Sequence, residues 1–161
     1  MKVIHFNTFD LFGGAAKAAY QLHKNLRQEG IDSLMIVKNK TSVDDSVIEI
    51  HDKHPSRNII TRLYQRSLIR FACKILYSVY ENRKNSEWRN LSTTFNKNIS
   101  SMSFDSIKSY LINADVICLH WINGFLSTKM IKSIQQFTNA PIVWTLQDIE
   151  PSTGGCHYPY D

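Results

Sequence analysis

The sequence predicts a doubly wound α/β fold, in which a parallel β-sheet carries helices on both faces. Two observations predict this fold. Short apolar segments typical of buried strands alternate along the chain with segments of helical periodicity, as they do in βαβ units. The chain of 161 residues, of which 43% are hydrophobic, is long enough to form one domain with a substantial core.

The first unit is the most clearly patterned. Residues 2–7 (KVIHFN) have the composition of a buried strand, and residues 15–28 are expected to form a helix without a breaker. Gly30 is expected to end that helix as its C-cap. Residues 33–37 (SLMIV) then form the second strand and complete a unit typical of parallel sheets. The helix is expected to bury the apolar residues that recur at helical spacing: Ala15, Ala18, Ala19, Leu22 and Leu26.

The middle of the chain is less regular. Residues 47–50 are expected to form a short strand, and residues 56–81 one long amphipathic helix. Residues 82–103 are rich in Asn, Ser and Thr and are expected to form a loop. Residues 56–103 are therefore interpreted as a helical and loop insertion within a single domain of residues 1–161. The side of the long helix opposite its apolar residues carries a basic line: Arg62, Arg66, Arg70 and Lys74.

Regular alternation returns after the insertion. Residues 104–111 are expected to form a short helix capped by Ser103, and residues 116–120 (VICLH) a buried strand. A helix over residues 127–137 follows, with its first residue as the N-cap. The last expected strand covers residues 141–145.

Composition limits the partners. The net charge of +5 and the pI of about 9.1 permit an acidic partner such as an anionic lipid or a phosphorylated ligand. No helix-turn-helix pattern or RNA-binding aromatic motif is present, so nucleic acid is not expected. The basic line has two interpretations. The helix is either an ordinary surface helix with solvated arginines or a helix that lies on anionic lipid. Three unpatterned cysteines suit a reducing cytosol.

Chemistry-bearing residues follow three of the expected strands. They are Gly13 and Gly14, His120 with Trp121, and Gln147 with Asp148. The carboxyl ends of parallel strands share one edge of the sheet, called the rim below, where ligands bind in such folds. The sequence therefore predicts a binding site at the rim.

Each of these motifs has a functional and a structural interpretation. Gly13 and Gly14 allow an anion to approach the backbone at a helix start, or they serve a tight turn. His120 either faces a ligand or bonds a neighbouring loop. Asp148 is a candidate base or hydroxyl acceptor, or it caps backbone amides. Cys156 and His157 are two adjacent metal-ligating residues without a second pair, so no metal site is predicted.

Three blocks of the sequence resemble a known family. FGGAAKAAYQLHKNL, ADVICLHWINGFLS and PIVWTLQDIEPSTGGCHYP are similar to the N-terminal half of family 4 retaining glycosyltransferases, in the bacterial branch that builds exopolysaccharide and colanic-acid-type polymers. The resemblance covers about half of the chain and omits residues 41–103. It implies a GT-B architecture of two Rossmann-like domains, of which this chain is the acceptor-side domain. The nucleotide-sugar domain is expected to lie outside these 161 residues, so the chain alone is expected to be inactive.

The resemblance also implies roles for individual residues. Gly13 and Gly14 would lie near the donor diphosphate or sugar, and His120 with Trp121 near the acceptor. Gln147 stands where the family usually has a His before Asp148, and Gln can bond a sugar hydroxyl but cannot carry a proton at neutral pH. The resemblance implies that Gln147 and Asp148 are the catalytic candidates and that Thr153 and Gly154 assist binding. It implies no required metal or cofactor, with a nucleotide-sugar as co-substrate and a saccharide or lipid-linked acceptor.

Other functions remain open. One is a Rossmann-like binding module for a small phosphorylated ligand without catalysis, and another is a truncated product with an interaction role. The preferred reading is a cytoplasmic enzyme of surface-polysaccharide synthesis, peripheral at the inner face of the plasma membrane.

Overall fold

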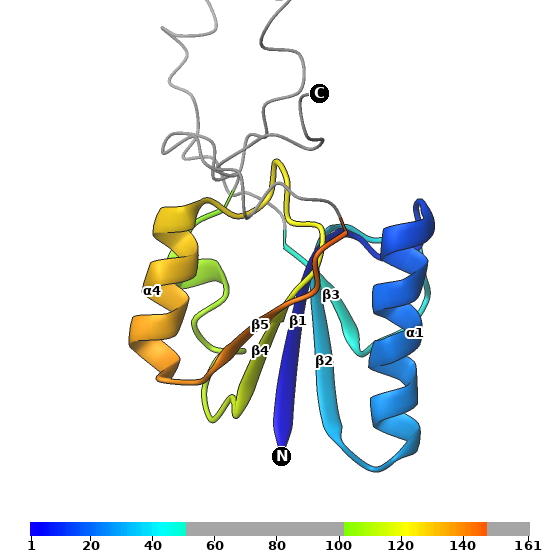
Figure 1. The fold of residues 1–161 in the computed structure, drawn as a ribbon, viewed down its shortest axis with the longest axis horizontal. Helices are drawn as coiled ribbons and strands as arrows, with labels where there is room; N and C mark the ends of the chain where they lie inside the picture. The colour runs from blue at the N-terminus through cyan, green and yellow to red at the C-terminus, as the bar shows by residue number, and fades with distance from the viewer. Residues whose placement is uncertain (51–101, 148–161) are drawn as a thin grey trace, which may run out of the picture. The chain divides into compact units, whose positions relative to one another are not determined.

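A computed structural model describes residues 1–50 and 102–147 of the chain. They form a five-stranded sheet in the order β3-β2-β1-β4-β5, in which every neighbouring pair of strands is parallel (Figure 1). The predicted α/β parallel sheet is confirmed. The elements in chain order are β1 (Lys2–Phe9), α1 (Gly14–Gln28), β2 (Asp32–Asn39), β3 (Val47–Glu49), the 3₁₀ helix η1 (Phe104–Ser106), β4 (Val116–Leu119), α4 (Thr128–Thr138) and β5 (Ile142–Trp144).

The direction of winding reverses at β1. The chain builds β2 and β3 on one side of β1 and then returns to build β4 and β5 on the other side. Helices α1 and α4 lie on opposite faces of the sheet (Figure 1). The point where the strand order reverses is the usual place for a ligand in open parallel sheets, and here it lies between the carboxyl ends of β1 and β4.

The two faces of the sheet are packed differently. Successive side chains of a strand point to opposite faces, so Ile4 and Phe6 join the cluster that contains Ile134 of α4. His5, between them, points to the other face, where Met35 and Ala19 belong to a smaller cluster. The α4 face therefore holds the larger apolar core, while the α1 face includes buried polar side chains.

Helix α1 begins and ends close to the predicted residues, but its buried face is only partly the predicted one. Gly30 has φ 75°, and the amide of Ile31 donates to the carbonyl of Leu26 over 3.0 Å, so the C-terminal glycine is confirmed. Ala19 is buried as predicted, but Leu22 is 42% exposed, while the polar His23 is fully buried beside Ala16. The polar His23 can occupy this face because both of its ring nitrogens find hydrogen-bond partners.

The second half of the described chain confirms one predicted helix and corrects another. Ser127 caps α4 by accepting from the amide of Met130 over 3.3 Å. The expected helix over residues 104–111 is wrong, because the segment forms only η1 followed by turns. Ser103 makes no capping bond with its side chain; instead the hydroxyl of Ser106 donates to the carbonyl of Ser103. Backbone amides in this segment donate to the carbonyl three residues earlier, which winds the chain more tightly than an α-helix. The side chain of Ile107 is nevertheless fully buried.

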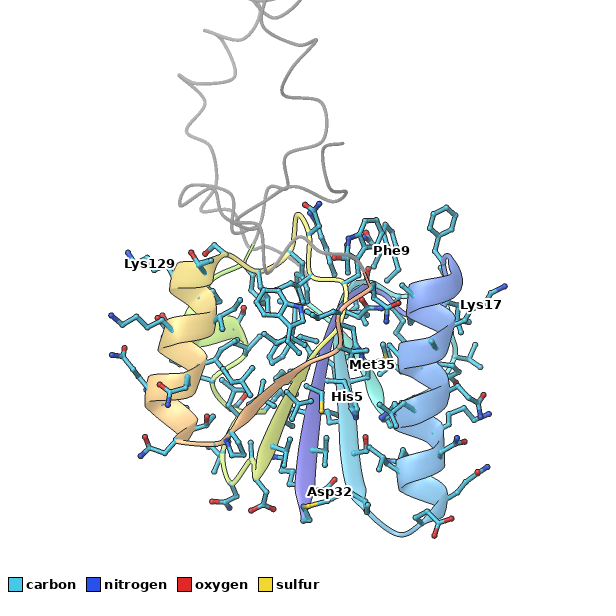
Figure 2. The ribbon with its side chains drawn as sticks, in the orientation of Figure 1. His5, Phe9, Lys17, Asp32, Met35 and Lys129 are labelled. Carbon is cyan, nitrogen blue, oxygen red and sulfur yellow. The ribbon has the colours of Figure 1, made fainter. Side chains whose placement is uncertain are left out.

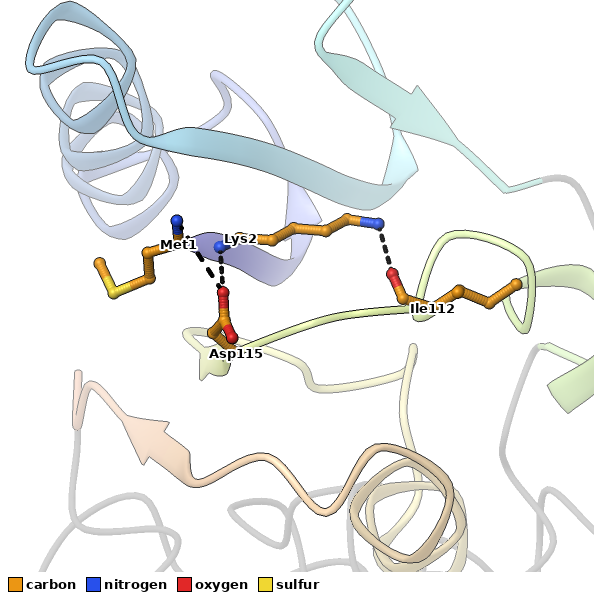
Figure 3. A network of polar contacts seen from close by, with 4 residues as sticks. All are labelled: Met1, Lys2, Ile112 and Asp115. Carbon is orange, nitrogen blue, oxygen red and sulfur yellow. Dashed lines mark hydrogen bonds and ion pairs between the residues drawn. The ribbon is translucent and has the colours of Figure 1, made fainter.

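Lys2 ties the amino end of the sheet to the segment before β4 (Figure 3). Its backbone amide donates to the carboxylate of Asp115 over 2.6 Å, and its ammonium donates to the carbonyls of Tyr110 and Ile112, each over 2.8 Å. The contacts join residues more than a hundred positions apart in the chain. They fix the start of the central strand.

Some predicted elements lie outside the described residues. The helix expected over residues 56–81, with its basic line, lies outside the described residues, as does the insertion of residues 56–103 except for its last two positions. Among the helices of residues 1–50 and 102–147, none is long and apolar enough to cross a membrane.

Candidate functional site at the carboxyl rim of the sheet

The carboxyl ends of β1 and β2 are joined to the loop after β4 by hydrogen bonds at the rim. The backbone amide of Thr8 donates to the carbonyl of Trp121 and its hydroxyl donates to the carbonyl of Asn123, both over 2.9 Å. The ammonium of Lys38 donates to the carbonyl of Gly124 over 2.6 Å, and Asn7 accepts from the amide of Trp121. The rim at the switch point is thus built by contacts among three strands.

Asp10 is the polar centre of this rim. The side chain is fully buried, and its carboxylate accepts from the amide and hydroxyl of Thr41 and from the amide of Ser42. Burial raises the pKa of Asp10, but the hydrogen bonds from Ser42 and Thr41 outweigh burial and lower the pKa to about 2. An ionised Asp10 therefore joins the loop after β1 to the loop after β2. In this structure the carboxylate fixes the backbone of these two loops through hydrogen bonds.

The loop after β1 ends in a glycine with a backbone that other residues avoid. Gly13 is the N-cap of α1 with φ 86° and ψ 169°, a region open essentially to glycine alone. No side chain caps the helix, and its first turn holds no acidic residue. A Cβ added at Gly13 or Gly14 would meet nothing within 4 Å, so the backbone here is open to approach. An open backbone at a helix start is compatible with the predicted phosphate contact, which stays a prediction.

His120 lies in the interior of the sheet and not on its open edge. It is 2% exposed, and its Nε2 lies 3.0 Å from Nδ1 of His5, which is fully buried. The two rings are nearly parallel, with an interplanar angle of 15°. One ring nitrogen of His120 already bonds His5, and the ring is buried. The predicted contact of His120 with a ligand stays a prediction.

The His5–His120 pair is neutral. Burial lowers the pKa of His5 to about 3, with smaller effects from His120 and His23, and burial lowers the pKa of His120 to about 4. In the hydrogen bond between the two rings, one imidazole donates and the other accepts. Whichever ring donates, one N–H group and one nitrogen lone pair of the pair remain without a partner. These are Nε2 of His5 and Nδ1 of His120, which are buried without a hydrogen-bond partner in the described structure.

A third histidine lies next to this pair. The ring of His23 stands edge-on to that of His5, with 5.8 Å between centroids. Its nitrogens bond the hydroxyls of Ser33 over 2.7 Å and Ser46 over 2.8 Å, and burial lowers its pKa. Three imidazoles thus share the α1 face of the sheet.

Sequence reasoning missed His5, His23 and Asp10. The signal for His5 and Asn7 was present, because polar residues two positions apart on a strand share one face. His23 gave no such signal, since its partners come from β2 and from the loop before β3. Asp10 gave only the general signal of an aspartate in a loop.

Of the other predicted site residues, Trp121 and Gln147 are described and the rest lie beyond residue 147. Gln147 follows β5 and is exposed. Trp121 follows β4 and is half-buried near Phe9. Among residues 1–50 and 102–147, no three His, Cys, Asp or Glu side chains are grouped so that they could hold a metal ion. The predicted residues outside the described chain are Asp148, Thr153, Gly154, Cys156 and His157.

No family model, curated protein or solved structure matches the chain.

Proposed function

We propose that this chain is the acceptor-side domain of a retaining glycosyltransferase of surface-polysaccharide synthesis. The observation that supports the proposal most is the glycine-only backbone of Gly13 at the uncapped start of α1. An approachable backbone at the start of a helix, next to a switch point, suits the diphosphate of a nucleotide-sugar. The three blocks that resemble the family contribute, in order, Gly13, Trp121 and Gln147 to the ends of β1, β4 and β5.

The proposed reaction transfers a sugar from a nucleotide-sugar to a saccharide or lipid-linked acceptor with retention of configuration. Backbone amides at the start of α1 would stabilise negative charge on the departing diphosphate. Gln147 would bond a sugar hydroxyl, with Asp148 beside it. The buried His5–His120 pair is neutral and would support the rim, while Asp10 would hold the loop that carries Gly13. The enzyme would act in the cytoplasm at the inner face of the plasma membrane.

Two experiments test the proposal. Sequencing the native transcript past codon 161 is expected to show a reading frame that continues for roughly another domain's length, with paired glutamates in its product. That complete product, given nucleotide-sugars and lipid-linked acceptors, is expected to release nucleoside diphosphate and keep the anomeric configuration. The 161 residues alone are expected to show no turnover, and turnover by them would contradict the division of roles between two domains.

A second candidate is a binding module for a small phosphorylated ligand without catalysis. The same open backbone at Gly13 and Gly14 favours it. Phosphate or a sugar phosphate would then shift the amide resonances of Gly14 and Ala15 in the isolated chain. A stop codon directly after codon 161, together with such shifts, would favour this candidate over the transferase.

A further inference from the structure

Five side chains between α1 and the sheet form one continuous line of hydrogen bonds. In the order of their contacts, they are Ser33 near the start of β2, His23 of α1, Ser46 and Asp44 from the loop after β2, and Tyr20 of α1. The line lies on the α1 face of the sheet, where Figure 2 labels His5 and Met35. His23 is fully buried and Ser33 is 1% exposed, so water has little access to the bonds between them.

Asp44 is the ionised end of this line. Burial raises the pKa of Asp44, but hydrogen bonds from Ser46 and Tyr20 outweigh burial and lower the pKa below its ordinary value. The hydroxyl of Tyr20 lies 3.1 Å from one carboxylate oxygen, and the hydroxyl of Ser46 lies 2.5 Å from the other. An ionised carboxylate can only accept. Both hydroxyls therefore donate to Asp44, and Ser46 uses its single hydrogen in doing so.

The tautomer of His23 follows from its contact with Ser46. The Oγ of Ser46 lies 2.8 Å from Nε2 of His23, and because its hydrogen points to Asp44 it can only accept there. Nε2 therefore carries a hydrogen. Burial lowers the pKa of His23 by more than Asp44 raises it, so the ring is neutral near neutral pH and Nδ1 keeps its lone pair. The hydroxyl of Ser33, 2.7 Å from Nδ1, then donates to it.

We infer that Asp44, acting through Ser46, holds His23 as the Nε2–H tautomer and so latches the loop after β2 onto α1. The hydrogen bond at one ring nitrogen decides which nitrogen carries the hydrogen. Every bond in the line donates toward Asp44, so none of them can reverse while that carboxylate is ionised. The His5–His120 pair differs in this respect, since no carboxylate bonds either ring and either ring can donate.

The latch holds one end of the loop after β2, and Asp10 holds the other. Asp10 accepts from Thr41 and Ser42 at the beginning of the loop, and Asp44 bonds α1 near its end. The loop contributes no buried apolar side chain between these anchors, because Val43 is 98% exposed. Its order therefore depends on the polar contacts. Asp44 is a positioning residue for a loop that Asp10 joins to the segment before α1.

Imidazole ¹⁵N NMR of the 161-residue chain near neutral pH tests the tautomer. The ring of His23 is expected to carry its hydrogen on Nε2 and to show the downfield shift of an unprotonated nitrogen at Nδ1. Asp44→Ala frees the hydroxyl of Ser46 to donate to Nε2, so the tautomer ratio is expected to shift roughly ten-fold toward Nδ1–H, which donates to Ser33. Asp45→Ala, at the exposed neighbouring position, is the matched control and should leave the ring unchanged.

Two serine variants test the direction of the line. Ser33→Ala removes the donor to Nδ1 and is expected to leave the hydrogen on Nε2 of His23. Ser46→Ala removes the acceptor of the Nε2 hydrogen and is expected to move that hydrogen to Nδ1. The assignment would be overturned by a parent ring with its hydrogen on Nδ1, by an even mixture of tautomers, or by a change of tautomer in Ser33→Ala.

Amide hydrogen exchange tests the latch itself. Asp44→Ala is expected to speed exchange at the amides of Thr41 and Ser42 roughly ten-fold, as loss of about one hydrogen bond does, while Ile117 in β4 keeps its parental rate. Equal acceleration at all three amides would reduce Asp44 to a contributor of global stability and overturn the latch. Unchanged rates at Thr41 and Ser42 would overturn it as well. None of these measurements involves glycosyl transfer, so their outcome is independent of the proposed function.

Discussion

Asp10 shows how one side chain can order the whole edge of a site. It is buried, yet every donor around its carboxylate comes from two loops that follow neighbouring parallel strands. Charge-assisted bonds of this kind are roughly twice as strong as neutral ones. The loop that leads to Gly13 therefore depends on a residue that need not touch any ligand.

Asp10→Asn is expected to destabilise the fold by about 2–4 kcal/mol. The amide has only one accepting oxygen, so its NH₂ group would face the N–H groups of Thr41 or Ser42. Urea unfolding at neutral pH measures the loss. Asp32→Asn, at an exposed position of β2, is the matched control and should stay within about 0.5 kcal/mol of the parent. An equal effect of the two substitutions would contradict the role of Asp10.

The His5–His120 pair makes stability depend on pH below the ordinary histidine range. Native pKa values of about 3 and 4 lie below the unfolded value of 6.5, so the unfolded chain binds protons that the folded chain does not. The stabilisation is complete above pH 6.5 and is lost as pH falls through the folded pKa values of about 4 for His120 and about 3 for His5. Between about pH 6 and 4.5 we expect the unfolding free energy to fall by about 1.4 kcal/mol per pH unit for each histidine.

Urea titrations across this range measure that slope. His120→Gln removes one imidazole and leaves an amide able to bond Nδ1 of His5. The slope contributed by the pair should fall to about half. A variant with the slope of the parent would show that His120 does not titrate as the burial of its ring requires.

At the scale of elements, α1 shows what the sequence can and cannot predict. Its existence and its C-terminal Gly30 follow from local propensity and backbone geometry. Its buried face does not, because burial of His23 is stabilised by Ser33 and Ser46 from outside the helix. The prediction of a helix after Ser103 was wrong for a related reason. The tight turns of this segment depend on the packing of Ile107 in the core and not on the periodicity of the segment itself.

The start of α1 offers a matched pair of substitutions. Gly13→Ala forces a side chain into φ 86° and is expected to cost about 1–3 kcal/mol, although its Cβ would clash with nothing. Gly14→Ala adds the same methyl group one residue later, inside the helix, and should be neutral or stabilising by up to about 1 kcal/mol. Thermal unfolding compares the two. Equal stabilities would mean that Gly13 is not held at its positive φ.

For the whole molecule, the fold was more predictable than the site. Alternating strands and helices specify the parallel sheet and hence a shared rim for Gly13, Trp121 and Gln147. The sequence did not indicate that His120 turns inward to His5, because that contact depends on the register between β1 and β4. Distant pairing of this kind leaves no periodic trace in one sequence.

The charge of the whole chain supports one further prediction. With a net charge of +5 and the basic line, the protein is expected to sediment with vesicles that contain phosphatidylglycerol and to dissociate as salt is raised. Each basic residue near the surface contributes about 1 kcal/mol, so Arg66→Gln with Arg70→Gln should weaken partitioning by more than ten-fold. Equal sedimentation with neutral phosphatidylcholine vesicles would contradict an electrostatic mode of attachment.

The central place of β1 also bears on how the protein folds. β1 can pair with β2 as soon as residues 1–39 have been synthesised. The other edge of β1 stays unpaired until β4 is made, because Val3 pairs with Val116. Closing so long a loop is entropically costly and slow compared with local pairing. During synthesis, β1 therefore carries an unpaired apolar edge for most of the length of the chain, and that edge is where misassociation of nascent molecules would begin.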